Sequence, residues 1–125
     1  MRKTSAILFI LGFLGAALLV LSATPQADRR LKGAFRMPPQ EGWTYVHLEG
    51  SPSEIGFQHG YLLAREIEDF KKVVALELRH DTQKEWNFFR EAAEHMLWPH
   101  VEQEYREELQ GIAAGLTARG LNLDL

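Results

Sequence analysis

The chain has 125 residues, of which 46% are hydrophobic and 25% charged, so its composition is that of an ordinary globular protein. Its 14 Lys and Arg against 17 Asp and Glu give a net charge of -3. This balance offers no basic face for phosphates, so we expect no nucleic-acid partner. The absence of cysteine excludes disulfides, thiolate metal sites and a cysteine nucleophile from these residues.

The N-terminus has the layout of a secretory signal. Arg2 and Lys3 precede an uninterrupted run of apolar or small residues, Ala6 to Leu21, and polar residues follow. We therefore expect residues 1–23 to be a signal peptide and the protein to be exported, to the periplasm or the extracellular space. The run is slightly short for a membrane span, which needs roughly 20 residues. An uncleaved anchor, with membrane contact through residues 6–23, remains the alternative.

Residues 24–42 show neither helical nor strand periodicity. They contain three prolines, two glycines and a basic cluster made of Arg29, Arg30 and Lys32. We expect an extended lead-in to the folded part. The basic cluster could contact anionic headgroups beside a retained anchor, although a solvated run of charges is the simpler interpretation.

The first element of the folded part, residues 43–125, is a short strand. Residues Trp43 to Leu48 are rich in aromatic and β-branched side chains, and the pattern stops at Gly50. No second strand is evident, so this strand would leave its backbone groups unpaired. We therefore expect the rest of the sheet to come from further sequence or from a partner chain.

A helix start follows directly. Ser51 can cap the helix, Pro52 suits its first position, and Glu54 lies where its carboxylate can bond back to the cap. The apolar periodicity predicts a helix from Pro52 to about Arg79, with a break over residues 80–83.

Small residues recur on one face of this predicted helix. Gly56, Gly60 and Ala64 are four residues apart, and each glycine costs a helix about 1 kcal/mol relative to alanine. We expect a neighbouring helix or sheet to pack closely against this face.

A second helical pattern covers Lys84 to Arg119. Pro99 cannot donate a backbone hydrogen bond, so we expect a kink or a break near residues 97–100. Gly120 suits the C-terminal cap. The pattern places three aromatic side chains on its apolar stripe, which favours core packing over ligand stacking: Trp86, Trp98 and Tyr105.

The order Gly50-Ser51-Pro52-Ser53-Glu54-Ile55-Gly56-Phe57-Gln58-His59-Gly60 resembles the opening motif of one group of N-terminal-nucleophile (Ntn) hydrolases. These are the proteins related to isopenicillin-N acyltransferase, phospholipase B-like proteins and choloylglycine hydrolase. Met96 to Pro99 and Glu107 to Leu116 also look like the helical region that precedes the nucleophile in that group. The resemblance spans residues 43–125.

The resemblance implies an αββα sandwich in which an internal nucleophile becomes a chain terminus after self-cleavage. It then attacks an amide or ester bond, with its own α-amino group as base. The chain has no Cys, and none of its Ser or Thr stands in a recognisable nucleophile context, so we assign no catalytic residue.

We expect an α+β fragment, mostly helical, with one N-terminal strand and two or three long amphipathic helices. It would be the propeptide-like or α-chain-like part of a linear amide hydrolase, acyltransferase or phospholipase B-like hydrolase, inactive alone. Its partners would be the downstream β-rich part and a small amide or ester substrate.

Candidate site residues are few. Gln58 and His59 could support a substrate pocket, although a histidine between glycines is more often a packing residue. Glu77 and His80 have the Glu-x-x-His spacing of di-iron helices, but no second pair accompanies them. We therefore predict neither a metal nor a cofactor. The alternative function is a small exported helical binding module, possibly anchored to the membrane, that uses the exposed strand and the glycine face.

Overall fold

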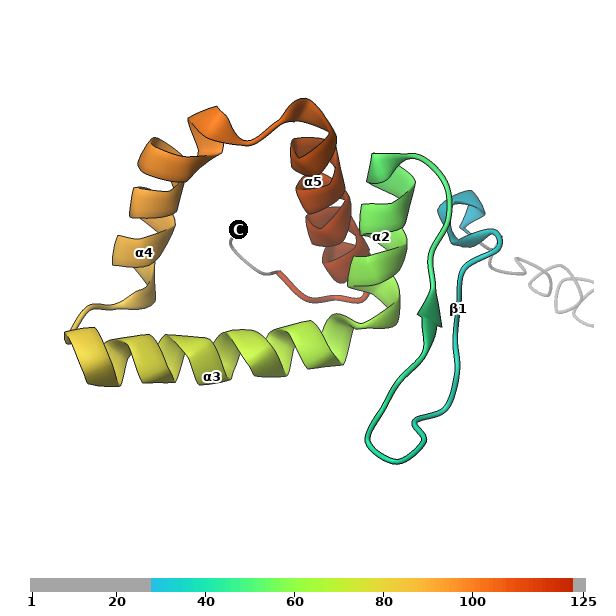
Figure 1. Ribbon diagram of the computed structural model, residues 1–125, viewed down its shortest axis with the longest axis horizontal. Helices are drawn as coiled ribbons and strands as arrows, with labels where there is room; N and C mark the ends of the chain where they lie inside the picture. The colour runs from blue at the N-terminus through green and yellow to red at the C-terminus, as the bar shows by residue number, and fades with distance from the viewer. Residues whose placement is uncertain (1–27, 123–125) are drawn as a thin grey trace, which may run out of the picture.

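The computed structural model describes residues 28–122; the expected signal or anchor (1–23), Thr24 to Ala27 and Leu123 to Leu125 lie outside the described residues. Four α-helices form an open frame, and a small hairpin lies beside one of them (Figure 1). The α+β, mostly helical fold expected from the sequence is confirmed. In chain order the elements are η2 (Arg29–Leu31), β1 (Phe35–Arg36), β2 (Val46–His47), α2 (Pro52–Leu62), α3 (Ala64–Thr82), α4 (Trp86–Ala92), η3 (Ala93–Leu97), η4 (Trp98–His100) and α5 (Gln103–Ala118).

The expected solitary strand has a partner within the chain. Strands β1 and β2 pair antiparallel, with Phe35 opposite His47 and Arg36 opposite Val46. The Met37 N–H donates to the Tyr45 carbonyl at 2.9 Å, which extends the ladder toward the loop. The expectation that residues 24–42 contain no strand is therefore wrong for the β1 residues. The resulting sheet has only two strands, and such a hairpin is marginally stable unless it packs on something else.

The long helix expected from Pro52 to Arg79 is two helices. Leu63, at φ -114° and ψ 23°, leaves the helical region and separates α2 from α3. The guanidinium of Arg36 donates to the Leu62 carbonyl at 3.2 Å and pairs with the carboxylate of Glu66. A hairpin side chain thus satisfies a carbonyl at the end of α2 and holds the start of α3. Because this contact crosses 26 residues, helical periodicity could not show it.

The glycine face of α2 packs against α5, as the sequence analysis expected of a close neighbour. A Cβ added to Gly56 would lie 2.0 Å from the Glu108 carbonyl oxygen, and one on Gly60 would lie 2.1 Å from that of Ile112. The reverse holds for α5, where a Cβ on Gly115 would lie 2.2 Å from the Phe57 carbonyl oxygen. We call these four residues the glycine interlock: Gly56, Gly60, Gly111 and Gly115.

The buried core surrounds this interlock. Phe57, Ala64 and Leu116 are the buried hydrophobic residues of the described chain, and Phe57 and Leu116 are almost fully excluded from water. Full burial of such side chains stabilises a fold by about 1.5–3 kcal/mol each. The α2–α5 pair is therefore the packed centre of the described part.

The expected break near Pro99 is confirmed. A π-helical turn, η3, and a 3-10 turn, η4, separate α4 from α5. Arg106 donates to the carbonyls of Val101 and Pro99 at 2.8 and 3.2 Å and so satisfies groups that the break frees. Gly120, at φ +78°, follows the end of α5, as expected of a cap.

The expected core packing of Trp86, Trp98 and Tyr105 is only partly realised. Trp86 and Trp98 are half-buried, whereas Tyr105 is 54% exposed. The reason is that α3 and α4 form an open frame (Figure 1), which leaves many of its apolar side chains exposed. None of the helices between residues 28 and 122 is long and apolar enough to cross a bilayer.

We expect Gly115→Ala to destabilise the chain by about 1–3 kcal/mol, because the new methyl group meets a backbone carbonyl that cannot move independently of α2. A loss of stability would separate the effect of close packing from that of helix propensity, because helix propensity alone would stabilise this variant by about 1 kcal/mol. Thermal unfolding followed by circular dichroism measures the change. Ala114→Leu, at the adjacent exposed position, is the matched control and should shift stability by less than about 0.5 kcal/mol. A Gly115→Ala variant more stable than the parent would contradict the interlock.

Candidate functional site around Gln58 and His59

The motif begins with the start of α2. The Ser51 hydroxyl accepts from the Glu54 N–H at 3.4 Å, and the Glu54 carboxylate accepts from the Ser51 N–H at 2.9 Å and from its hydroxyl at 2.8 Å. The predicted capping box is therefore present. These bonds from Ser51 hold the pKa of Glu54 below its usual value. Their role is to fix where α2 starts.

Gln58 is buried, with 1% of its surface exposed, and its amide is engaged on both sides. The Oε1 atom accepts from the Glu49 N–H at 2.8 Å. The Nε2 group donates to the carbonyls of Glu49 at 2.8 Å and Arg30 at 2.7 Å. One side chain on α2 thus ties down both the chain after β2 and the turn before β1.

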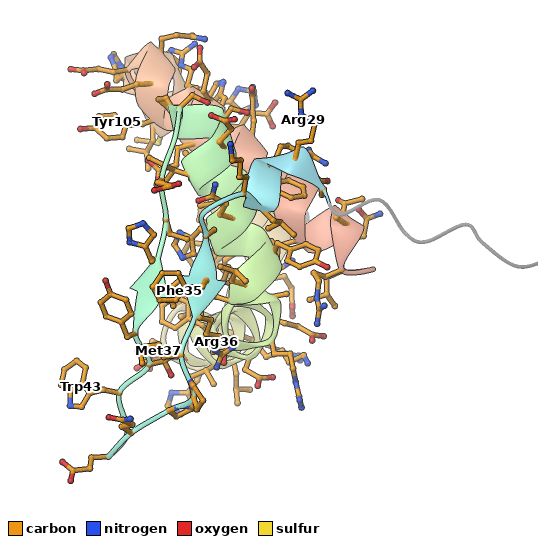
Figure 2. All side chains as sticks on the ribbon, turned by 90° about the vertical axis from the view of Figure 1, so that its right-hand side faces the viewer. Arg29, Phe35, Arg36, Met37, Trp43 and Tyr105 are labelled. Atoms are coloured by element: carbon orange, nitrogen blue, oxygen red, sulfur yellow. The ribbon has the colours of Figure 1, made fainter. Side chains whose placement is uncertain are left out.

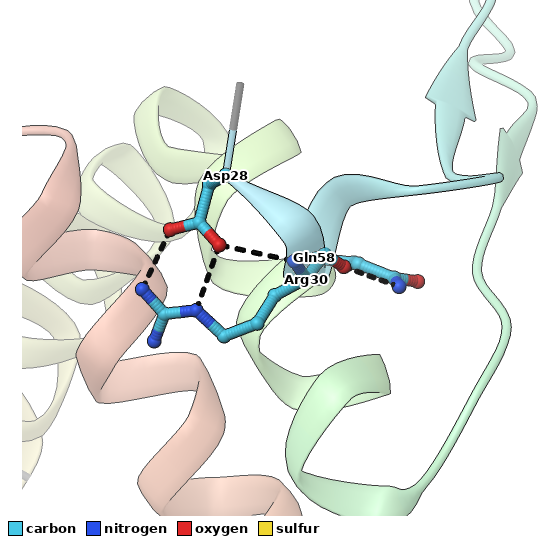
Figure 3. A network of polar contacts seen from close by, with 3 residues as sticks. All are labelled: Asp28, Arg30 and Gln58. Carbon is cyan, nitrogen blue, oxygen red and sulfur yellow. Dashed lines mark hydrogen bonds and ion pairs between the residues drawn. The ribbon is translucent and has the colours of Figure 1, made fainter. Parts of the chain in front are cut away.

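Arg30 of η2 also contacts α2 through its side chain, and its ion pair with Asp28 is drawn in Figure 3. The Asp28 carboxylate accepts three hydrogen bonds from Arg30, and the Arg30 guanidinium lies 3.5 Å from the centre of the Phe57 ring. The bonds from the Arg30 side chain and backbone lower the pKa of Asp28 to about 2. Because the folded pKa lies below the ordinary one, this contribution to stability is present above about pH 4 and is lost as pH falls toward 2.

A histidine–carboxylate contact lies beside this network. His47 Nε2 is 3.2 Å from the Glu49 carboxylate, and both side chains are partly exposed. The carboxylate occupies the space where a side chain at Gly33 would be, since a Cβ there would lie 1.8 Å from Glu49 Oε1. Gly33 also has a φ of +81°, so two constraints favour glycine at this position.

His59 is half-buried on α2, and no side-chain hydrogen bond of His59 occurs within the described residues. It neighbours Gln58 in sequence only; the structure does not bring the two side chains into one polar cluster. The expectation that this pair supports a substrate pocket stays a prediction. The geometry gives Gln58 a structural role.

Glu77 and His80, the pair considered for metal binding, both lie on α3. His80 Nδ1 lies 2.8 Å from the Asp81 carboxylate, with both side chains exposed near the end of α3. Within residues 28–122, no group of three or more His, Asp or Glu side chains is placed to hold a metal ion.

A hollow of about 250 Å³ lies at the end of α5, lined by Thr117, Gly120, Leu121 and Asn122. It carries no acid, base or cation, and it is not lined by Gln58 or His59. Gln58 supplies polar contacts within the described residues, and it does not line this hollow.

The sequence analysis missed three residues that contribute to this region. Gly111 and Gly115 have the same four-residue spacing as Gly56 and Gly60, and that match between two helical patterns was a usable signal. Arg36 gave no such signal, because its partners on α2 and α3 are 26 and 30 residues away.

Comparison with curated proteins finds a weak relative. The chain is 34% identical over 86 residues to an uncharacterized protein of Archaeoglobus fulgidus, a match that covers 63% of this chain and 14% of the relative. The chain thus spans about one seventh of that protein's length. No protein-family model matches the chain, and no solved structure matches it.

We expect Gln58→Leu to destabilise the chain by about 2–4 kcal/mol, because it leaves one N–H and two carbonyls without their partner. Urea unfolding measures the loss. Gln110→Leu, an exposed glutamine on α5, is the matched control and should change little. Unchanged stability in Gln58→Leu would contradict the structural role and favour a role in binding.

Proposed function

We propose that this chain is the N-terminal part of an exported Ntn hydrolase or acyltransferase, related to the isopenicillin-N acyltransferase, phospholipase B-like and choloylglycine hydrolase group, which acts on amide or ester bonds. The observation that carries the proposal is the ordered motif from Gly50 to Gly60. In this reading the nucleophile belongs to further sequence, and residues 28–122 form scaffold.

The geometry of the motif supports a scaffold role. Gly50 turns the chain at φ +123°, and Ser51 and Glu54 start the helix. Gly56 and Gly60 allow the close approach of α5. Gln58 then fixes the segments before β1 and after β2 to that helix. These motif residues thus hold α2, α5 and the hairpin together. Such a role suits a segment that positions other helices and strands.

The exposed apolar side chains of the frame support the proposal that residues 28–122 are part of a larger folded unit. Three apolar side chains of α3 point to uncovered surface, with Phe70 and Leu76 each 70% exposed and Val73 62% exposed. In η3, Met96 is 68% and Leu97 64% exposed. Large contiguous apolar surfaces in soluble proteins usually mark contact sites. A further layer packed against α3 and η3 would bury these side chains.

The span of the archaeal relative is compatible with this proposal. That protein is about seven times as long as the segment it shares with this chain, so the shared segment occurs there within a much longer polypeptide. The name of the relative carries no information on activity, and the proposed chemistry depends on the motif alone.

The chemistry of the proposed whole protein constrains what this chain contributes. An N-terminal nucleophile uses its own α-amino group as base, so the reaction needs no acid or base from elsewhere in the chain. The described residues would provide rigid support for the nucleophile-bearing strand.

The complete reading frame that contains these 125 codons tests the proposal directly. We expect its protein product to cleave itself before a Cys, Ser or Thr, as mass spectrometry would show, and to hydrolyse a p-nitroanilide or p-nitrophenyl ester of a fatty acid. Replacing that new N-terminal residue by Ala should abolish both events. A frame that ends here, with a product that is monomeric and unfolds cooperatively, would instead favour the exported binding module.

The role of the open frame is tested with Phe70→Ser combined with Val73→Ser and Leu76→Ser. In the 125-residue chain we expect reduced binding of the dye 8-anilinonaphthalene-1-sulfonate with unchanged helix content, since these side chains are already exposed. In the longer product the same change should cost about 2 kcal/mol or more, because it would place hydroxyls in a packed layer. Equal stability of the two longer products would contradict burial of this surface.

A further inference from the structure

A second apolar surface lies on the outer face of the hairpin, away from the frame. Opposite residues of an antiparallel pair share a face, so Phe35 and His47 lie together, and Met37 lies with Tyr45. The ring centres confirm this arrangement: Phe35 is 5.2 Å from His47 and 6.0 Å from Tyr45. The alternate residue Arg36 reaches in the other direction, to α2 and α3.

This outer face is rich in exposed aromatic surface (Figure 2). Tyr45 is 56%, Phe35 48% and Met37 44% exposed, and Trp43 is 82% exposed where the loop meets β2. We call these four residues the hairpin patch. Tryptophan and tyrosine are enriched where proteins meet the headgroup level of a bilayer, because their rings are apolar and their tips polar.

The start of the described chain lies on the same side of α2 as the hairpin. Figure 1 shows η2 and the hairpin on the side of α2 away from α5. The apolar run of residues 6–21 ends seven residues before Asp28, so its end lies within about 25 Å of η2. Arg29 and Lys32, both exposed, follow Asp28 and carry charge that favours phosphate headgroups.

We propose that the hairpin patch rests on the surface of a lipid bilayer, in which the apolar run of residues 6–21 is held. A bilayer is favoured over a protein partner because the preceding apolar run brings a membrane within reach of the patch, and the exposed cations Arg29 and Lys32 lie between the two in the sequence. The rings of Trp43 and Tyr45 then lie where the headgroups meet the acyl chains, beside Phe35 and Met37. This inference concerns a different surface from the proposed function and does not depend on it.

Trp43 provides the probe. The full chain carrying Trp86→Phe and Trp98→Phe retains Trp43 as its single indole. With phosphatidylcholine and phosphatidylglycerol vesicles, brominated acyl chains should reduce its fluorescence about twofold relative to unbrominated vesicles, because bromine quenches indoles that lie in the bilayer. Mass spectrometry first confirms that residues 1–23 are present.

The matched control retains Trp98 through Trp43→Phe and Trp86→Phe. Trp98 lies in η4, across the frame from the hairpin (Figure 1), so bromination should leave its fluorescence unchanged. A vesicle-bound chain with unquenched Trp43 would overturn the proposal and indicate that protein or water covers the patch. Equal quenching of both indoles, or a chain that does not bind vesicles, would overturn it as well.

A labelling experiment avoids the multiple tryptophan substitutions. Because the chain lacks cysteine, Met37→Cys gives one site for a nitrobenzoxadiazole label, and Ala114→Cys on the exposed face of α5 gives its control. We expect vesicles to raise the emission of the label at position 37 severalfold over that at position 114. Equal emission at the two positions would contradict contact through the hairpin.

Discussion

The approach of α2 to α5 through four glycines is the constraint on which the rest of the described structure depends. At this distance the backbone of each helix occupies the space where the other would carry side chains. The buried side chains Phe57 and Leu116 lie on these two helices, and Gln58 anchors the hairpin and η2 to the same α2. The helices α3 and α4 extend from this unit and bury little apolar surface of their own.

Local signals in the sequence predicted the features that local chemistry determines. The capping box at Ser51, the break at Pro99 and the positive-φ glycine after α5 each depend on residues within about one helical turn. Strand β1 and the bend at Leu63 escaped prediction because both depend on long-range contacts. The first needs β2 as its partner, and the second is stabilised by Arg36 from the hairpin.

The candidate site shows the same difference between features that local sequence determines and features that long-range contacts determine. The sequence identified Gln58 by its place in a motif. Only the structure shows that its side-chain amide forms hydrogen bonds with two segments that precede α2. His59, its neighbour, carries no comparable contact within the described residues. The residues of this motif can therefore be distinctive because they connect helices and strands. In that case the chemistry proposed for the whole protein belongs to residues outside the motif. The hairpin patch and the exposed apolar side chains of α3 are two separate surfaces, which suits two different contacts.

Residue-resolved amide hydrogen exchange of the 125-residue chain tests the central claim most directly, since exchange reports which segments open together. The account predicts that the α2 and α5 amides are the slowest to exchange and share one opening free energy, while most α3 and α4 amides exchange faster. Protection in α3 and α4 equal to or greater than that in α2 would show that the glycine interlock is not the centre of the fold.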